Sequence, residues 1–182
     1  MKTFKDYLEA IQEFTGLTDS SSITMKKIDS LCLFVATGFG TGYSPWASGT
    51  VGTLPGVAIA LLLSPFVLPI QILVVLALIA GSVPFCDRAE KIFGTKDDGR
   101  IVADEMVTFP LCLLGLTGAP LWMWALAFLN HRILDILKPP PARQIQDLKG
   151  GLGIVADDVV SSLYCLGLNH LMFWAITHFI AR

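Results

Sequence analysis

The sequence has little charge and no cysteine pattern that would organise a fold. Only 15% of its 182 residues are Asp, Glu, Lys or Arg, against roughly 25% in an average soluble domain. The formal net charge of −2 gives no support to nucleic-acid binding, which needs a basic surface. The four scattered cysteines include no C-x-x-C pair, so neither a zinc site nor a disulfide framework is expected. The first residues also lack the apolar stretch of a secretory signal.

Charge is missing altogether from three long runs, 57–84, 106–130 and 159–181. The hydrophobic fraction of 53% and the mean hydropathy of +0.64 are high for a soluble domain. Each run is about long enough to cross a bilayer, which takes ~20 apolar residues. However, prolines and glycines interrupt the first run at 64–69 and the second at 115–120. Such residues stop or kink a helix, so both runs are expected to turn back.

Turns at these breaks predict two helical hairpins, with arms near 50–63 and 70–92 and near 104–115 and 121–138. This arrangement gathers every Lys and Arg between positions 26 and 149 at one end and leaves the opposite turns uncharged. The positive-inside tendency then places the charged end in the cytoplasm. Strand alternation is weak throughout. The sequence therefore predicts an all-α, multihelical bundle of short apolar hairpins with a polar, acidic active-site end, either membrane-associated or membrane-embedded.

The two ends of the chain have their own patterns. Residues 3–15 place apolar side chains on one helical face, which predicts an amphipathic helix packed on the domain or lying on a membrane surface. Residues 16–23 are typical of a linker. The last apolar run either spans a membrane outright or bends near 167–170. We expect two parts, an N-terminal helix with linker over 1–29 and a helical domain over 30–182.

The segment 38–56 combines six glycines with several serine and threonine hydroxyls. It is predicted to be a loop, either simply flexible or a cradle whose N–H groups and hydroxyls hold phosphate oxygens. It matches neither a Walker A motif, because no lysine follows, nor the dinucleotide-binding glycine pattern. The expected phosphate-binding residues of such a cradle are Gly40, Thr41, Ser44, Gly49 and Thr50.

Acidic residues stand in adjacent pairs at the mouths of the uncharged runs. Asp104-Glu105 precedes the second run and Asp157-Asp158 precedes the third. Capping and the helix dipole could explain one such pair, but an ionised carboxylate beside an apolar run is costly unless it has a partner. A metal ion removes that cost, and hard oxygen ligands suit Mg²⁺. The candidate metal ligands are Asp97, Asp104, Glu105, Asp135, Asp157 and Asp158.

Basic residues complete the pattern. Arg132, Asp135 and Lys138 form a stripe on one helix, which the prolines at 139–141 terminate. An ordinary ion pair with a C-terminal lysine is one interpretation; the other is a phosphate site, with arginine as a fork and lysine as a point charge. With Mg²⁺, such a site would hydrolyse a phosphomonoester through polarised oxygens and an activated water. The expected catalytic residues are Asp104, Arg132, Lys138 and Asp158.

Other mechanisms and functions fit less well. No cysteine has an arginine six residues later, no D-x-D-x-[TV] segment is present, and only His131 lies near the charged residues. A CDP-alcohol-type lipid phosphotransferase would need its aspartates on one helix, whereas here they form pairs on different ones. A non-enzymatic membrane scaffold or transporter would leave the carboxylate pairs, Arg132 and Lys138 unexplained.

The chain carries four segments in a fixed order: GFGTGYSPWASGTVGTLPG, DDGRIVADE, HRILDILKPPP and GGLGIVADD. As an ordered set they resemble the bacterial phosphatidylglycerophosphatase A family over about Ala36–Ser161. The resemblance implies an α-helical fold, Mg²⁺ dependence and hydrolysis of phosphatidylglycerophosphate to phosphatidylglycerol in phospholipid synthesis. It also implies an anionic phospholipid substrate and the bacterial inner (cytoplasmic) membrane, with the active site facing the cytoplasm. No protein partner follows from it. The matched motif positions are Asp97, Asp104, Glu105, Arg132, Asp135, Lys138, Asp157 and Asp158.

Overall fold

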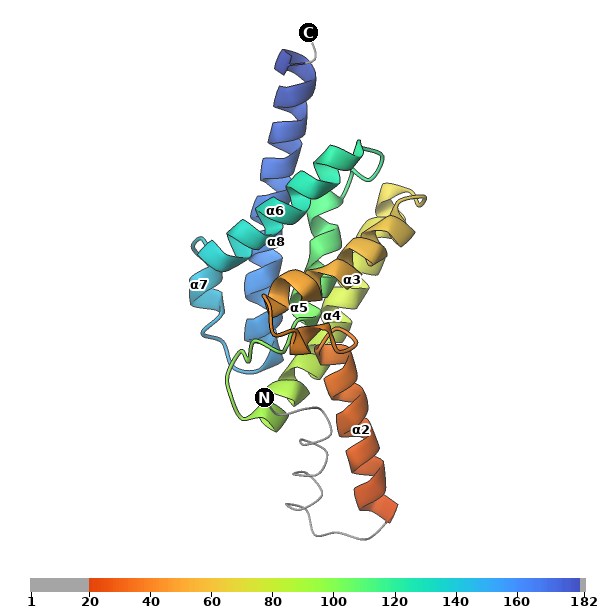
Figure 1. Ribbon diagram of the computed structural model, residues 1–182, viewed down its shortest axis with the longest axis vertical. Coiled ribbons are helices and arrows are strands. Elements are labelled where there is room, and N and C mark those ends of the chain that lie inside the picture. The colour runs from red at the N-terminus through yellow and green to blue at the C-terminus, as the bar shows by residue number, and fades with distance from the viewer. Residues whose placement is uncertain (1–19, 181–182) are drawn as a thin grey trace.

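The computed structural model describes residues 20–180, and this range is all α-helical without a strand (Figure 1). The predicted all-α class is therefore confirmed, while the helix expected over 3–15 lies outside the described residues. The elements are α2 (Ser20–Ala36), the 3₁₀ turn η1 (Thr41–Tyr43), α3 (Ser48–Leu63), α4 (Leu68–Phe93), α5 (Ala103–Thr108), the 3₁₀ turn η2 (Phe109–Leu113), α6 (Leu121–Leu137), α7 (Ala142–Ile145), α8 (Gly151–Ala175) and the π-helical turn η3 (Ile176–Ile180).

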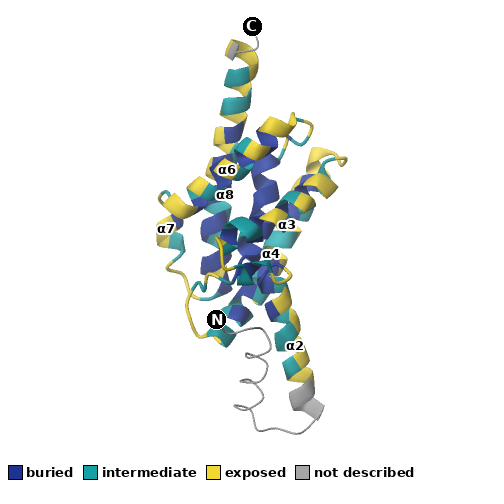
Figure 2. Cartoon of the chain, viewed as in Figure 1, coloured by how far each residue is buried: buried dark blue, intermediate teal, exposed yellow. Residues whose placement is uncertain are grey.

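The segment formed by α5 and η2 lies at the centre of the molecule. Of its residues only Glu105 is not buried, and α3, α4, α6 and α8 all pack against it. Pro110 has no N–H to donate to the carbonyl of Met106, which explains why the α-helix tightens there into a 3₁₀ turn. Figure 2 shows buried residues concentrated in the middle of the molecule and exposed residues at the free ends of α2, α3 and α8.

The helices α4 and α8 are long and apolar enough to cross a membrane by length and composition. Only 17% of the apolar 18-residue stretch of α4 and 22% of that of α8 is buried. Neither helix therefore resembles the core helix of a soluble domain. The two helices pack together, and the N–H of Gly151 at the start of α8 donates to Asp87 near the end of α4 at 3.4 Å. Their charged ends therefore lie together.

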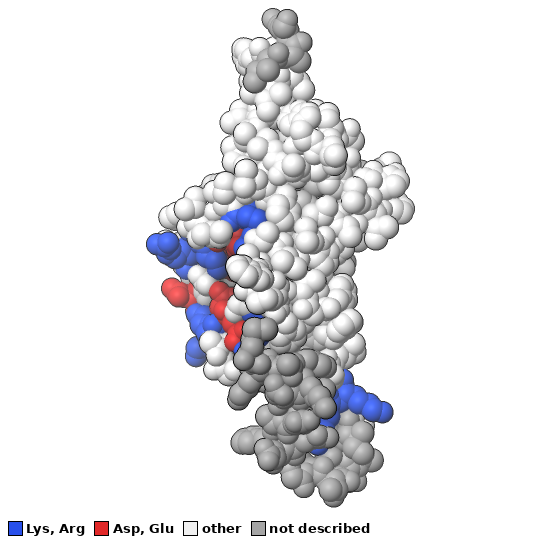
Figure 3. All heavy atoms as spheres, viewed as in Figure 1, with Lys and Arg blue, Asp and Glu red and all other residues white. Residues whose placement is uncertain are grey.

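Charged side chains are confined to part of the surface. In the view of Figure 3 they lie at mid-height on the left side and near the lower end, and the upper part, formed by the C-terminal part of α8 and the turn between α3 and α4, shows none. The exposed side chains in that upper region include Leu62, Phe66, Leu171 and Trp174. An exposed surface of this kind and extent is typical of contact with lipid.

The glycine-rich segment 38–56 is a loop only as far as Ala47, which corrects the sequence prediction. From Ser48 onward it is helical, and its glycines serve helix packing. A Cβ on Gly52 would lie 2.4 Å from Val102, and one on Gly56 would lie 2.5 Å from the carbonyl oxygen of Met106. The glycines of α3 therefore allow the backbone of α5 to approach closely.

One further prediction is wrong in detail, because residues 20–23 belong to α2 rather than to a linker. The expected boundary between residues 29 and 30 stays a prediction. Of the two alternatives for the last apolar run, the bend near 167–170 does not occur, because α8 continues to Ala175. Asp157 and Asp158 lie in the second turn of α8. Where the second hairpin is expected, the chain forms α5 with η2 and then α6.

Candidate functional site

A polar cavity of about 260 Å³ lies between α5, the C-terminal end of α6 and the start of α3. Five carboxylates but only two cations line it, so the cavity carries an excess of negative charge when its acids are ionised. Helices far apart in sequence supply these side chains, and α5 contributes the two central ones. The charged lining residues are Asp97, Asp104, Glu105, Arg132, Asp135, Lys138 and Asp158; the uncharged ones are Ser48, Gly49, Gly99, Ile101 and Ile136.

Arg132 is held by two carboxylates. Its Nη1 lies 2.5 Å from Oε2 of Glu105 and 2.9 Å from Oδ2 of Asp135, and the hydroxyl of Thr53 donates to the same Glu105 oxygen at 3.0 Å. Gly49 lies beside this pair, because a Cβ there would be 2.3 Å from Oε1 of Glu105 and 2.6 Å from Nη2 of Arg132. The second guanidinium nitrogen therefore faces the N-terminal end of α3.

Lys138 is anchored in a similar way. Its Nζ lies 2.5 Å from Oδ2 of Asp157 and 3.6 Å from Oδ2 of Asp97, and Gln146 donates to the same Asp97 oxygen. Burial works to lower the pKa of Lys138, but the hydrogen bond and charge of Asp157 outweigh it and raise that pKa. The lysine therefore stays charged at physiological pH.

Backbone strain accumulates around the cavity. Asp97, Lys138 and Ala47, which precedes the lining residue Ser48, all have a positive φ, at 49°, 43° and 45°. Non-glycine residues adopt this region at a cost, and they persist there only where the surroundings enforce it. In this protein two of the three carry charges into the cavity, which is typical of a functional site.

Two carboxylates in the cavity each have an oxygen without a hydrogen-bond partner. Asp104 is 6% exposed and Asp158 is 2% exposed, and Oδ1 of the first and Oδ2 of the second have no hydrogen-bond partner. Burial, with the negative charge of Glu105 next, raises the pKa of Asp104 well above its ordinary value. A buried carboxylate without partners is costly, so this pair of oxygens calls for protons or a cation.

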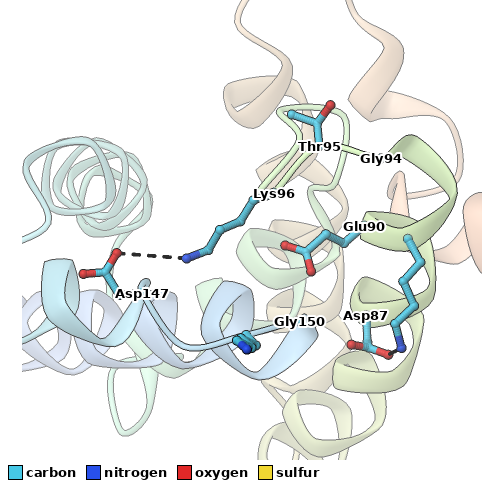
Figure 4. A pocket seen from close by; sticks show the side chains of 9 residues that line it. Asp87, Glu90, Gly94, Thr95, Lys96, Asp147 and Gly150 are labelled. Atoms are coloured by element: carbon cyan, nitrogen blue, oxygen red, sulfur yellow. Dashed lines mark hydrogen bonds and ion pairs between the residues drawn. The ribbon is translucent and has the colours of Figure 1, made fainter.

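A larger, open cleft of about 720 Å³ lies on the other side of the loop after α4 (Figure 4). Its three lysines and three acids are balanced in number, and two pairs are in contact: Lys91 lies 2.6 Å from Asp87, and Lys96 lies 4.0 Å from Asp147. Exposed, paired charges of this kind carry little energy. The smaller cavity, with its buried and unmatched carboxylates, is the better candidate site.

The family model for phosphatidylglycerophosphatase A matches residues 34–173, which include every residue that lines the polar cavity. The chain belongs to the phosphatidylglycerophosphatase A family. This membership confirms the enzyme class, a phosphoric monoester hydrolase, and sets aside the alternatives of a scaffold, a transporter or a phosphotransferase.

Three relatives cover most of the chain. A protein of Bacteroides thetaiotaomicron provisionally named a phosphatidylinositol-3-phosphatase is 37% identical over 84% of this chain and 99% of its own. The phosphatidylglycerophosphatase A of Escherichia coli is 35% identical over 76% of this chain and 81% of its own. That of Haemophilus influenzae is 34% identical over 78% of this chain and 90% of its own. No solved structure matches the chain.

The residues predicted for this family site differ in where they lie. Gly40, Thr41 and Thr50 do not line the polar cavity, Ser44 lines a neighbouring cavity of about 310 Å³, and Gly49 lines the polar cavity itself. The hydroxyl of Thr41 bonds instead to the carbonyl of Gly38 at 2.8 Å. The remaining predicted residues all line the polar cavity except Asp157, which lies behind Lys138.

Sequence reasoning missed three contributors to the site. Ser48 lines the cavity and donates to the carbonyl of Gly99 at 2.7 Å, Thr53 holds Glu105, and Gln146 holds Asp97. Ser48 and Thr53 belong to the hydroxyls of the glycine-rich segment 38–56, but nothing distinguishes them from the other hydroxyls there, and Gln146 has no signal beyond a polar side chain near a motif. His131 is 1% exposed, and burial lowers its pKa to about 4. It does not line the cavity, so it offers no nucleophile there.

Proposed function

We propose that the protein is a Mg²⁺-dependent lipid phosphatase that hydrolyses phosphatidylglycerophosphate to phosphatidylglycerol and phosphate. The observation that carries the proposal is the polar cavity with five carboxylates and two cations. A phosphomonoester is itself an anion, and it would be repelled by an excess of carboxylates. A divalent ion offsets two of the three negative charges that Arg132 and Lys138 leave uncompensated when all five acids are ionised.

The residues of the cavity fit Mg²⁺ in their chemistry. All the acidic donors are hard oxygens, and the buried Asp104 and Asp158 each have an oxygen without a partner. Among residues 20–180, no three His, Cys, Asp or Glu side chains are already close enough to hold an ion. Mg²⁺ does not require such a cage, because it keeps several waters and is usually held by one or two carboxylates together with substrate phosphate. Either Asp104 or Asp158 would hold it here, with Asp97, Glu105 and Asp135 around it, and the other would be left to act on a water.

The remaining steps belong to the side chains of this chain. Nη2 of Arg132 and the first turn of α3 at Ser48 and Gly49 bind the phosphate oxygens, since a helix N-terminus favours an anion. Lys138 neutralises charge on the far side of the cavity. A carboxylate, Asp104 or Asp158, accepts the proton of a water as its oxygen attacks phosphorus. The phosphorus–oxygen ester bond breaks, the departing lipid alkoxide takes up a proton from solvent while the carboxyl releases its own, and the lipid alcohol and inorganic phosphate leave. Mg²⁺, when bound, would supply polarisation of the phosphate oxygens and would offset the developing charge.

We place this reaction at the bacterial inner membrane, with the cavity facing the cytoplasm. The charged ends of α4 and α8 lie together, and on the face shown in Figure 3 the lysines and arginines lie away from the apolar upper part. The positive-inside tendency supports the cytoplasmic orientation. The membrane also contains the anionic phospholipid substrate.

A phosphoinositide is the second candidate substrate, because the relative from Bacteroides thetaiotaomicron is named for one. Both headgroups carry a phosphomonoester on a polyol and differ in the size of that polyol. The neighbouring cavity of about 310 Å³ shares Ser48 and Gly99 with the polar cavity, and it has hydroxyls that suit either polyol. The ratio of kcat/KM for the two lipids decides between them.

The test measures phosphate release by purified protein in detergent micelles. Phosphatidylglycerophosphate, phosphatidylinositol 3-phosphate and glycerol 3-phosphate are each assayed with Mg²⁺ and with EDTA. We expect Mg²⁺-dependent release from phosphatidylglycerophosphate and little from the soluble ester. Full activity in EDTA would remove the metal from the proposal. No release from any lipid would remove the lipid phosphatase function itself.

A further inference from the structure

A second, apolar cavity lies on the other face of α5. It has a volume of about 280 Å³ and is bounded by α2, α3, α4 and α5. Ala103, Met106 and Val107 of α5 form one side, and Ala77 and Gly81 of α4 lie on another. We call it the apolar groove. Its one polar side chain, Ser82, already donates its hydroxyl to the carbonyl of Ile79 at 2.8 Å. The groove therefore offers no unsatisfied polar group to an occupant.

The helix α5 separates two chemically opposite spaces. Asp104 and Glu105 line the polar cavity, while Ala103, Met106 and Val107 of the same helix line the apolar groove. A helix with its side chains is about 10 Å across, so the two spaces are about one helix width apart. A molecule that occupies both must be charged at one end and hydrocarbon at the other. A phospholipid has this form.

We propose that the apolar groove seats an acyl chain of the phospholipid whose phosphomonoester enters the polar cavity. This inference rests on the proposed function and adds the means by which the lipid is positioned. The acyl chain holds the phospholipid at one side of α5, while its headgroup reaches the carboxylates at the other side. Positioning of this kind lowers the entropy lost in reaching the reactive geometry.

The size and surroundings of the groove favour a hydrocarbon chain over a protein segment. Its volume lies just below the roughly 300–1,000 Å³ of pockets that enclose whole small molecules, so it suits a slender chain. The helix α4 also carries exposed leucines outside the groove, with Leu73 69% and Leu76 55% exposed. We take the phase around α4 to be lipid, because the helix is long and apolar enough to span a bilayer. An acyl chain then enters the apolar groove without crossing water.

Gly81 provides a clean test, because a Cβ built there meets no atom within 4 Å. Gly81 and Ala77 line the groove and are exposed at its rim, so Gly81→Leu places an apolar side chain at the opening of the groove without a clash, and Ala77→Leu does so from one helical turn away. Gly167 of α8 also has open space around its Cβ position and does not line the groove. Gly167→Leu is the matched control for an added apolar side chain on a membrane helix. All variants are checked for helical circular dichroism and melting temperature.

The assay compares dioleoyl phosphatidylglycerophosphate with its deacylated headgroup. For Gly81→Leu and Ala77→Leu we expect KM for the dioleoyl lipid to rise about tenfold, with turnover of the deacylated headgroup unchanged. Gly167→Leu should match the wild type on both. The inference is overturned if Gly81→Leu matches Gly167→Leu on the dioleoyl lipid, or if both substrates lose activity equally.

A binding measurement separates this inference from the proposed function. The protein is incorporated into phosphatidylglycerol vesicles containing a phospholipid with a diazirine in its acyl chain, and the photolabelled peptides are mapped. We expect labelling within α4 and α5 next to the groove, and its loss in Gly81→Leu but not in Gly167→Leu. Labelling unaffected by Gly81→Leu contradicts the groove even when the wild type is an active phosphatase. Absence of phosphatase activity with the expected labelling contradicts the proposed function alone.

Discussion

At the scale of single residues, the polar cavity contains two kinds of charged side chain: those held in ion pairs and those with an oxygen that has no hydrogen-bond partner. Arg132 and Lys138 are held in short ion pairs with Glu105 and Asp157, which fixes their positions. Asp104 and Asp158 are the opposite case, because each is buried and keeps an oxygen free of partners. Paired charges define the walls of the site, and the unpaired oxygens are the groups available for chemistry.

Asp104→Asn and Asp158→Asn test this division. Each change keeps the shape of the side chain but removes a negative charge from the cavity, so we expect turnover to fall by about 100-fold or more with helical circular dichroism intact. The measurement is Mg²⁺-dependent phosphate release. His170→Ala is the control, because His170 bonds to the carbonyl of Leu114 far from the cavity, and its activity should be nearly that of the wild type. Wild-type turnover in either aspartate variant would remove that residue from the mechanism.

At the scale of elements, the packing of α3 on α5 links the glycine pattern to the site. One face of α3 carries Gly49, Gly52 and Gly56. Each of these glycines contacts α5 or Val102, the residue that precedes α5. The contacts differ in kind along the helix. At Gly56 the neighbour is the rigid backbone of Met106, whereas at Gly49 it is the movable ends of Glu105 and Arg132.

This difference predicts opposite outcomes for two similar substitutions. Gly49→Ala should cost little stability, because side-chain ends can move, but it should displace the Glu105–Arg132 pair and lower turnover. Gly56→Ala should destabilise the fold by about 1–3 kcal/mol, because backbone must shift to relieve the overpacking. Thermal or denaturant unfolding and phosphate release, measured on both variants, give the comparison. Equal effects of the two substitutions on stability and turnover would contradict this interpretation.

At the scale of the whole molecule, the protein has a polar pole and an apolar pole. The charged cavity, the cleft of Figure 4 and the charged ends of α4 and α8 lie toward the first. The turn between α3 and α4 and the loop around Gly118 lie toward the second, where Thr117 of that loop accepts a hydrogen bond from Gln71 near the start of α4. Such a molecule is oriented by a membrane, since only one pole tolerates hydrocarbon.

Two introduced cysteines test this orientation. Lys149→Cys lies at the polar pole beside the open cleft, and Gly118→Cys is exposed at the apolar pole. Cys32→Ser provides the background, because the other native cysteines are buried. In intact spheroplasts we expect a membrane-impermeant thiol reagent to label Gly118→Cys and to spare Lys149→Cys until the cells are lysed. Labelling of Lys149→Cys before lysis would place the polar pole outside the cytoplasm.

Much of the local structure could be predicted from the chain alone because it depends on local causes. The prolines and glycines at 64–69 and 115–120 mark two interruptions in the structure. The helix α3 ends at Leu63 and α4 begins at Leu68, and η2 ends at Leu113 and α6 begins at Leu121. The glycine face of α3 could not be recognised in the same way. A run of glycines predicts a loop on conformational grounds, and only the nearby backbone of α5 explains why glycine is needed inside a helix.

By itself, the sequence determined the composition of the molecule: its helical class, its long uncharged runs and the types of residue available for a site. These follow from backbone preferences and from the cost of placing charge beside hydrocarbon, which neighbouring residues already express. The tertiary structure decided which of those residues meet. It placed Asp104 and Asp158, 54 positions apart in their residue numbers, in one cavity. It also set Asp157 behind Lys138 and left Thr41 and Thr50 outside the lining of that cavity. Proximity between distant residues depends on how whole helices cross and pack, and no local pattern contains that information.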